Sequence, residues 1–154
     1  MLASGASGRQ AAHGCRGAAL AGRFAVVPGS AGAGSISYAL RLRNVSASAC
    51  TLTGLPSGRL LGLRKDALPT HVRAERPGAH AVRVTLRPGR VAVATARFSP
   101  DVPGVGETMM GPCEPTAHWF RVTARAGGTT MVGLAPPTPV CEHGQLRFSA
   151  YRPG

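Results

Sequence analysis

Short runs in which apolar and polar residues alternate are the feature that most restricts the fold of this chain. The clearest run extends from Ser35 to Asn44, with apolar residues at every second position from Ile36 to Leu42 and arginines at Arg41 and Arg43. A period of two is typical of a half-buried β-strand, and helical periodicity is nearly absent. Further strands are predicted over Leu20–Val27, Cys50–Thr53, Arg59–Leu63, Val82–Leu86, Val91–Arg97, Trp119–Ala124, Thr129–Leu134 and Leu146–Tyr151.

Clusters of Gly, Pro and Ser separate these runs, and the chain contains 21 glycines and 13 prolines in all. Eight or nine short strands joined in this way indicate an all-β fold, namely an immunoglobulin-like antiparallel β-sandwich, with a closed barrel as the structural alternative. Pro88-Gly89 predicts a hairpin between the runs on either side of it. Two long loops are expected over Asp66–His80 and Pro100–Pro115, and Met109 and Met110 in the second loop are expected to pack against the sandwich.

Four cysteines, Cys15, Cys50, Cys113 and Cys141, are separated by 35, 63 and 28 positions, which is unlike the paired spacing of a zinc site. We therefore predict disulfides. Of the three possible connectivities we favour Cys15 with Cys50 and Cys113 with Cys141, because this pairing closes the shorter loops. Disulfides persist in oxidising compartments, so the prediction implies export, and buried free thiols are the alternative.

The N-terminal stretch Met1–Gly14 lacks the basic and apolar regions of a signal peptide. We expect a flexible leader over residues 1–14 and one β-sandwich domain over residues 15–154. No segment reaches the roughly 18 consecutive apolar residues that a spanning helix needs, so no transmembrane segment is predicted. An exported precursor would need a targeting signal upstream of this sequence, and it could also carry a membrane tether there.

The formal net charge is +12, and it comes almost entirely from arginine, since Lys65 is the only lysine. Such a charge favours anionic partners. The arginines are spread along the whole chain, however, which favours a solvated polar face over a nucleic-acid site. With one Trp, two Tyr and four Phe, several of them in predicted core strands, the chain also offers few rings for stacking on bases.

Residues 32–56 carry a pattern in which a strand ends in Asn and small polar residues and is followed by Cys-x-Leu-x-Gly-x-Pro. Its positions are Asn44, Cys50, Leu52, Gly54, Leu55 and Pro56. Leu86, Pro88 and Gly89 then form a Leu-x-Pro-Gly sequence, and two later cysteines follow. From about Cys15 onward the chain resembles domain of unknown function 4232, a family of actinobacterial extracellular and lipoprotein domains that has an aromatic residue where Leu55 stands.

The resemblance implies a secreted or membrane-tethered β-sandwich with two disulfides and no assigned activity. It supplies no catalytic residues. Ala12-His13-Gly14 before Cys15 is a poor lipobox, so Cys15 is better explained as a disulfide partner.

A metal centre is the main alternative function, because Cys141-Glu142-His143 brings a thiol and an imidazole together in sequence. A blue-copper site would need a Met after these residues; Met131 precedes them, and the predicted disulfide uses Cys141. His71, His80 and His118 are expected at the surface. Motifs of hydrolases and phosphate-binding loops are missing from the sequence, and Glu107, Glu114 and Glu142 lie in loop-like sequence where solvation is the expectation.

We therefore expect a non-catalytic secreted or cell-envelope module that acts by binding or interaction, with no cofactor and no catalytic residue. Its partner is unknown from sequence, and an anionic cell-wall polymer or another envelope protein would suit its charge. Nucleic acid is not the expected partner. The alternative is an extracytoplasmic copper- or zinc-binding protein.

Overall fold

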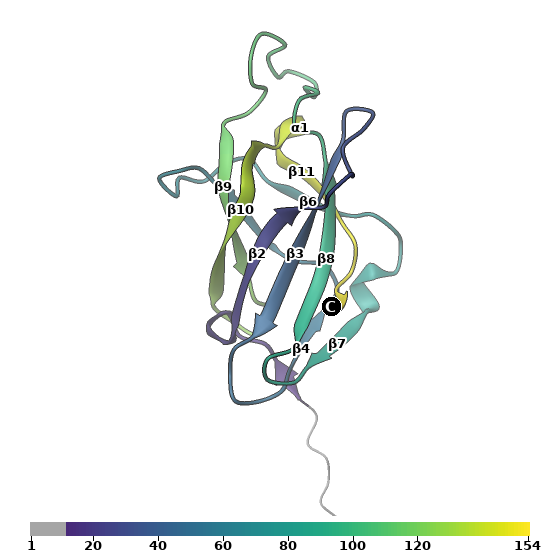
Figure 1. The fold of residues 1–154 in the computed structure, drawn as a ribbon, viewed down its shortest axis with the longest axis vertical. Helices are drawn as coiled ribbons and strands as arrows, with labels where there is room; N and C mark the ends of the chain where they lie inside the picture. Colours follow the sequence, from purple (N-terminus) through teal and green to yellow (C-terminus); the bar gives the residue numbers. More distant parts are fainter. Residues whose placement is uncertain (1–11) are drawn as a thin grey trace, which may run out of the picture.

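The computed structural model describes residues 12–154, and Figure 1 shows that their regular secondary structure is almost entirely β-strand, joined by loops. These residues form two sheets, one of nine strands and one of three. Disulfides join Cys15 to Cys50 and Cys113 to Cys141. The predicted all-β sandwich with two disulfides is confirmed. The expected leader lies largely outside the described residues, and its last two residues, His13–Gly14, form strand β1.

The large sheet consists of β2 (Leu20–Val26), β3 (Ile36–Asn44), β5 (Gly58–Leu61), β6 (His71–Ala74), β8 (Val91–Phe98), β9 (Thr116–Thr123), β10 (Thr129–Pro139), β11 (Gln145–Phe148) and β12 (Arg152–Pro153). Its order is β5-β9-β10-β2-β3-β8-β11-β6, and β12 pairs with β8. Most neighbours are antiparallel, whereas β10 with β2 and β11 with β6 are parallel.

The small sheet has the order β1-β4-β7, where β4 is Cys50–Thr53 and β7 is Arg83–Leu86. Strand β1 runs parallel to β4, and β7 runs antiparallel to it. Three short helical turns complete the fold, η1 (Gly17–Ala19), η2 (Ala79–Ala81) and α1 (Cys141–Gly144).

The alternation in β3 has the predicted consequence. Tyr38, Leu40 and Leu42 are at most 1% exposed, while Arg41 and Arg43 face solvent. Burying a large apolar side chain contributes roughly 1.5–3 kcal/mol, so the inward row of β3 is enough to fix the register of the strand.

A cluster of aromatic rings fills the middle of the core. The ring centroid of Phe24 on β2 lies 5.7 Å from Tyr38, 5.5 Å from Phe120 and 5.8 Å from Phe148. Phe120 on β9 and Phe148 on β11 lie far apart in the strand order, yet their centroids are 6.0 Å apart. The large sheet therefore curls around these rings and approaches a barrel.

The predicted hairpin around Pro88-Gly89 is wrong. Strand β7 pairs with β4 in the small sheet, whereas β8 pairs with β3 in the large sheet. Gly89 has a φ of 80°, and its N–H donates to the Asn44 carbonyl at 2.7 Å. The turn thus connects two layers, because its backbone bonds go to β3 and leave the two flanking strands unpaired with each other.

The predicted continuous loop over Asp66–His80 is also wrong in its middle, where β6 pairs with β11 at the edge of the sheet. The strand has only four residues, all of them exposed or half-buried. A short edge strand of this kind has too few buried positions for alternation to be visible in sequence. The loop predicted over Pro100–Pro115 is confirmed, since β8 ends at Phe98 and β9 begins at Thr116.

Candidate functional site

The four predicted cysteines pair as expected. Cys15 and Cys50 have Cα atoms 4.8 Å apart and join the start of the domain to β4. Cys113 and Cys141, 5.6 Å apart, attach the loop between β8 and β9 to the turn before β11. Cys113 and Cys141, the two cysteines near His143, therefore form a disulfide with each other, so neither can supply a thiolate ligand there.

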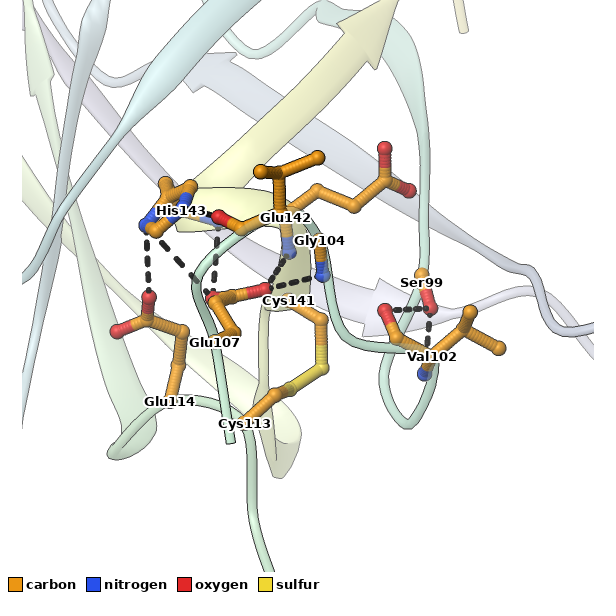
Figure 2. Close-up of polar contacts among 10 residues, drawn as sticks. Ser99, Val102, Gly104, Glu107, Cys113, Glu114, Cys141, Glu142 and His143 are labelled. Atoms are coloured by element: carbon orange, nitrogen blue, oxygen red, sulfur yellow. Dashed lines mark hydrogen bonds and ion pairs between the residues drawn. A yellow bond between two sulfur atoms is a disulfide. The ribbon is translucent and has the colours of Figure 1, made fainter. Parts of the chain in front are cut away.

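The second disulfide lies beside a buried carboxylate, as Figure 2 shows. The Glu107 side chain is only 2% exposed. Its Oε1 accepts hydrogen bonds from the backbone N–H groups of Gly104 and Glu142, both at 2.6 Å, and its Oε2 accepts one from the His143 N–H at 3.0 Å. The expectation that Glu107 is solvated is wrong, because three backbone donors take the place of water around the carboxylate.

These hydrogen bonds hold an uncommon backbone conformation. Glu142 and His143 have φ angles of 55° and 57°, so α1 is a left-handed turn over these two residues. Non-glycine residues adopt this region rarely and at some cost in free energy. Because Glu107 accepts the N–H groups of both residues, it offsets that cost and joins two segments 35 residues apart in sequence.

Glu114 and His143 complete the cluster. The Nδ1 atom of His143 lies 3.5 Å from Glu114 Oε1 and 3.9 Å from Glu107 Oε2. On the other side of the ring, Nε2 lies 2.8 Å from the Val105 carbonyl oxygen. Because a carbonyl oxygen can only accept, Nε2–H donates to it, and Nδ1 faces the two carboxyl groups.

The pKa values of the two carboxyl groups move apart. Burial alone would raise the pKa of Glu107, but hydrogen bonds from Glu114 and from three backbone N–H groups outweigh burial and hold this pKa at about 2. Burial, the hydrogen bond to Glu107 and the charge of Glu107 raise the pKa of Glu114 to about 6. The hydrogen bond to Val105 and the two nearby carboxylates raise the pKa of His143.

The other candidate metal ligands of the sequence lie elsewhere. Of the histidines, only His143 joins a group of His, Cys, Asp or Glu side chains in residues 12–154 that could surround a metal ion. Met109 and Met110 are 85% and 91% exposed, so the expectation that they pack against the sandwich is wrong. The disulfide and Glu107 hold their loop, which leaves these two side chains free of any packing role.

Arginines that are scattered in sequence come together on the outer side of the large sheet. We call this group the arginine face; it consists of Arg23, Arg41, Arg43, Arg73, Arg97, Arg147 and Arg152, all exposed. The strand order produces it, because β2, β3, β8, β11 and β6 are consecutive neighbours and each has arginine at outward positions. Sequence reasoning missed the face because the arginines are far apart along the chain.

Like charges lie directly opposite one another on this face. Arg23 pairs in register with Arg41, and Arg147 lies between Arg97 on one side and Arg73 on the other. Directly opposed like charges destabilise a sheet. The strands that carry the face contain no Asp or Glu, and the ion pairs found among residues 12–154 all involve His143. No arginine of the face therefore has an ion-pair partner among residues 12–154, and the acid Glu142 lines the same surface hollow as Arg97 and Arg147.

The motif residues that carried the family resemblance have structural roles. Asn44 is fully buried at the end of β3, and its side chain bonds to residues of the following turn and to the Leu86 carbonyl. The Asn-x-Ser pattern that it forms with Ser46 thus serves the fold. In the described part of the chain, no helix is long and apolar enough to cross a membrane.

Comparison with curated proteins and with solved structures finds no match to this chain. A family model does match, over residues 15–152, which is nearly the whole described part of the chain. The chain therefore belongs to the family described as Domain of unknown function (DUF4232).

Proposed function

We propose that the protein is a non-catalytic, extracytoplasmic binding module whose arginine face holds an anionic polymer of the cell surface. One observation carries this proposal: seven exposed arginines lie on neighbouring strands of one sheet, and these strands contain no Asp or Glu. Guanidinium groups bind phosphate and carboxylate through paired N–H donors. A polyanion would therefore relieve the repulsion on this face while gaining contacts.

Two further features support the proposal. The disulfides favour an oxidising compartment outside the cytosol. The aromatic rings favour a polymer without bases, because the rings other than Trp119 are buried and Trp119 is half-buried with the Lys65 ammonium 5.6 Å from its ring centre. Nucleic-acid binding surfaces commonly add exposed rings for stacking. The most reactive side chains already have structural roles, because the cysteines form disulfides and Glu107 accepts backbone hydrogen bonds.

The test measures binding of fluorescein-labelled linear polyphosphate by anisotropy as a function of NaCl concentration. The triple variant Arg23→Gln, Arg41→Gln, Arg43→Gln should bind at least about tenfold more weakly. The magnitude of the slope of log K against log salt should fall by about 2, because fewer phosphate contacts form and fewer counterions are released on binding. The matched control is Arg64→Gln, Arg76→Gln, Arg83→Gln, which removes the same charge from exposed positions off the face.

An equal loss of affinity in both triple variants would mean that net charge alone attracts the polymer, and the arginine face would not be the site. Tighter binding to a single-stranded oligonucleotide of the same charge would assign the face to nucleic acid instead.

A metal site is the second candidate function, because ligand atoms of Glu107, Glu114 and His143 lie within 4.8 Å of one another. The bond from Nε2 to a backbone carbonyl is the orientation that metal-binding histidines usually have, and carboxylate with imidazole suits zinc. Against it, the oxygens of Glu107 already accept three N–H groups. Calorimetric titration with Zn²⁺ tests this candidate: it predicts stoichiometric binding that Glu114→Gln weakens strongly, and no binding at submillimolar zinc refutes it.

A further inference from the structure

A cavity of about 380 Å³ opens between β4 and the end of β9, near the first disulfide. Ligand-binding pockets in proteins commonly have volumes of about 300–1,000 Å³. Leu20, Leu52, Leu55 and Val122 are among the apolar residues that line it. The cavity is separate from the arginine face, since none of the seven arginines lines it.

The wall of this cavity contains the hydroxyl group of Tyr151. Tyr151 is only 4% exposed and lines the cavity, where its hydroxyl has no hydrogen-bond partner among residues 12–154 but is accessible from the cavity. Burial, with no hydrogen bond to oppose it, raises the pKa of this phenol. A few polar groups on an apolar wall commonly fix the orientation of a bound ligand. A polar group of a ligand inside the cavity would replace water as the hydrogen-bond partner of this hydroxyl.

The rim of the cavity is basic. Arg125 lines the opening, is exposed and has no carboxylate within ion-pair distance among the described residues. Arg16 lies next to it, where its guanidinium donates to the carbonyl of Ala126, another lining residue, at 3.4 Å. Charge complementarity therefore favours an anionic group at the opening, above the apolar wall.

The cavity is preformed by covalent and backbone links. Cys15 is part of its lining, and the disulfide to Cys50 holds the chain against β4. The N–H of Cys15 also donates to the Thr51 carbonyl at 2.8 Å, and the N–H of Tyr151 donates to the Gly54 carbonyl at 3.1 Å. A ligand would not have to order these segments, so little binding energy is lost to conformational entropy.

We propose that this cavity binds a small organic anion with an apolar body, whose charged group meets Arg125 and whose polar group bonds to the Tyr151 hydroxyl. The inference goes beyond the proposed function, because it concerns a second site with a different ligand class. A fatty acid or an aromatic carboxylate or sulfonate of small size has this chemistry.

The probe is 8-anilinonaphthalene-1-sulfonate, whose fluorescence rises in apolar surroundings, and the competitor is decanoate. The full chain should bind one probe molecule, and decanoate should displace it. Arg125→Gln should weaken binding by about tenfold or more, and Tyr151→Phe, which removes only the hydroxyl, by about threefold to tenfold. Thr123→Trp, at an exposed residue of the rim, should block the opening and abolish binding.

Arg147→Gln is the matched control, because it removes one charge from the arginine face and should leave probe affinity unchanged. Thermal unfolding of each variant confirms that it is folded. Binding of several probe molecules that decanoate does not displace, or an equal effect of Arg125→Gln and Arg147→Gln, would refute the site. Neither result depends on whether polyphosphate binds the arginine face, so the two proposals fail separately.

Discussion

At the scale of single residues, Asn44 shows how one buried amide organises a turn. Its Oδ1 accepts from the N–H and the hydroxyl of Ser46, at 2.9 and 2.7 Å. Its Nδ2 donates to the carbonyls of Ser48 and Leu86, at 2.8 and 3.0 Å. All its hydrogen-bonding capacity is used, and the bond to Leu86 ties the large sheet to β7 in the small one. This explains why Asn is needed at the end of β3.

Replacing this residue tests that role. Asn44→Ala should lower the free energy of unfolding by roughly 2–3 kcal/mol, because it leaves buried backbone groups without partners. Urea denaturation monitored by circular dichroism measures the change. The control is Ser48→Ala, at an exposed residue of the same turn, which keeps the carbonyl that Asn44 contacts and should have an effect below about 0.5 kcal/mol. An unchanged urea midpoint for Asn44→Ala would show that water replaces the amide without cost.

Residues differ in how well their roles could be predicted. The cysteines were predictable, because spacing and number alone limit what four thiols can do. Glu107 was not, because its partners are backbone N–H groups 3 and 35 residues away, and backbone donors leave no mark in sequence. The position of the Tyr151 hydroxyl in a cavity wall was also not predictable, because the sequence does not show which polar groups lack a partner within the folded chain.

At the scale of elements, alternation identified strands but not their neighbours. The run 35–44 was predicted from its own residues, because side-chain period is local. The pairing of β7 with β4, in place of the predicted pairing with β8, depends on where the Asn44 turn directs the chain. Parallel pairs such as β2 with β10 join segments about a hundred residues apart, which no local pattern encodes.

The loop between β8 and β9 should make stability depend on pH. The pKa of Glu114 rises from 4.5 to about 6 on folding, so its contribution is complete below pH 4.5 and is lost as pH rises through 6. The pKa of Glu107 falls to about 2, so its contribution is present above pH 4.5 and is lost as pH falls through 2. The pair therefore stabilises the fold most near pH 4.5, and about 1 kcal/mol of this stabilisation is lost by pH 6.5 as Glu114 ionises. The full pKa shift would correspond to a larger loss, but water at the loop surface screens part of the interaction.

Chemical denaturation between pH 4 and 7 measures this dependence. Glu114→Gln keeps the shape of the side chain and its hydrogen bond to Glu107 but cannot ionise, so its unfolding free energy should vary less with pH over the same range. Glu75→Gln, at an exposed acid away from the loop, should retain the wild-type dependence. Identical pH profiles for wild type and Glu114→Gln would contradict the raised pKa of Glu114.

At the scale of the whole molecule, function-bearing features arise from topology. The arginine face requires the order β2-β3-β8-β11-β6, which brings together arginines from five strands, and the pairing of β12 with β8 adds Arg152. The curling of the large sheet around Phe24 and its neighbours buries the rings and turns the arginines outward together. Composition predicted an anionic partner, but only the strand order decides which side of the molecule would meet it.

Seven unpaired arginines on one face repel each other through the solvent, so the folded state should gain stability when that repulsion is screened. The Debye length falls from about 30 Å at 0.01 M salt to about 8 Å at 0.15 M, which exceeds the strand spacing but removes the longer-range part of the repulsion across the face. The melting temperature should therefore rise between 0.01 and 0.15 M NaCl.

Two triple variants separate repulsion on the face from repulsion by the total charge. Arg23→Gln, Arg41→Gln, Arg43→Gln should be more stable than wild type by about 1 kcal/mol at low salt, and its salt response should be smaller. The off-face triple Arg64→Gln, Arg76→Gln, Arg83→Gln keeps the face intact and should retain most of the wild-type response. If both triples respond alike, the repulsion comes from the total charge of the molecule. It is then not concentrated on the arginine face, and a polyanion bound there would relieve no special repulsion.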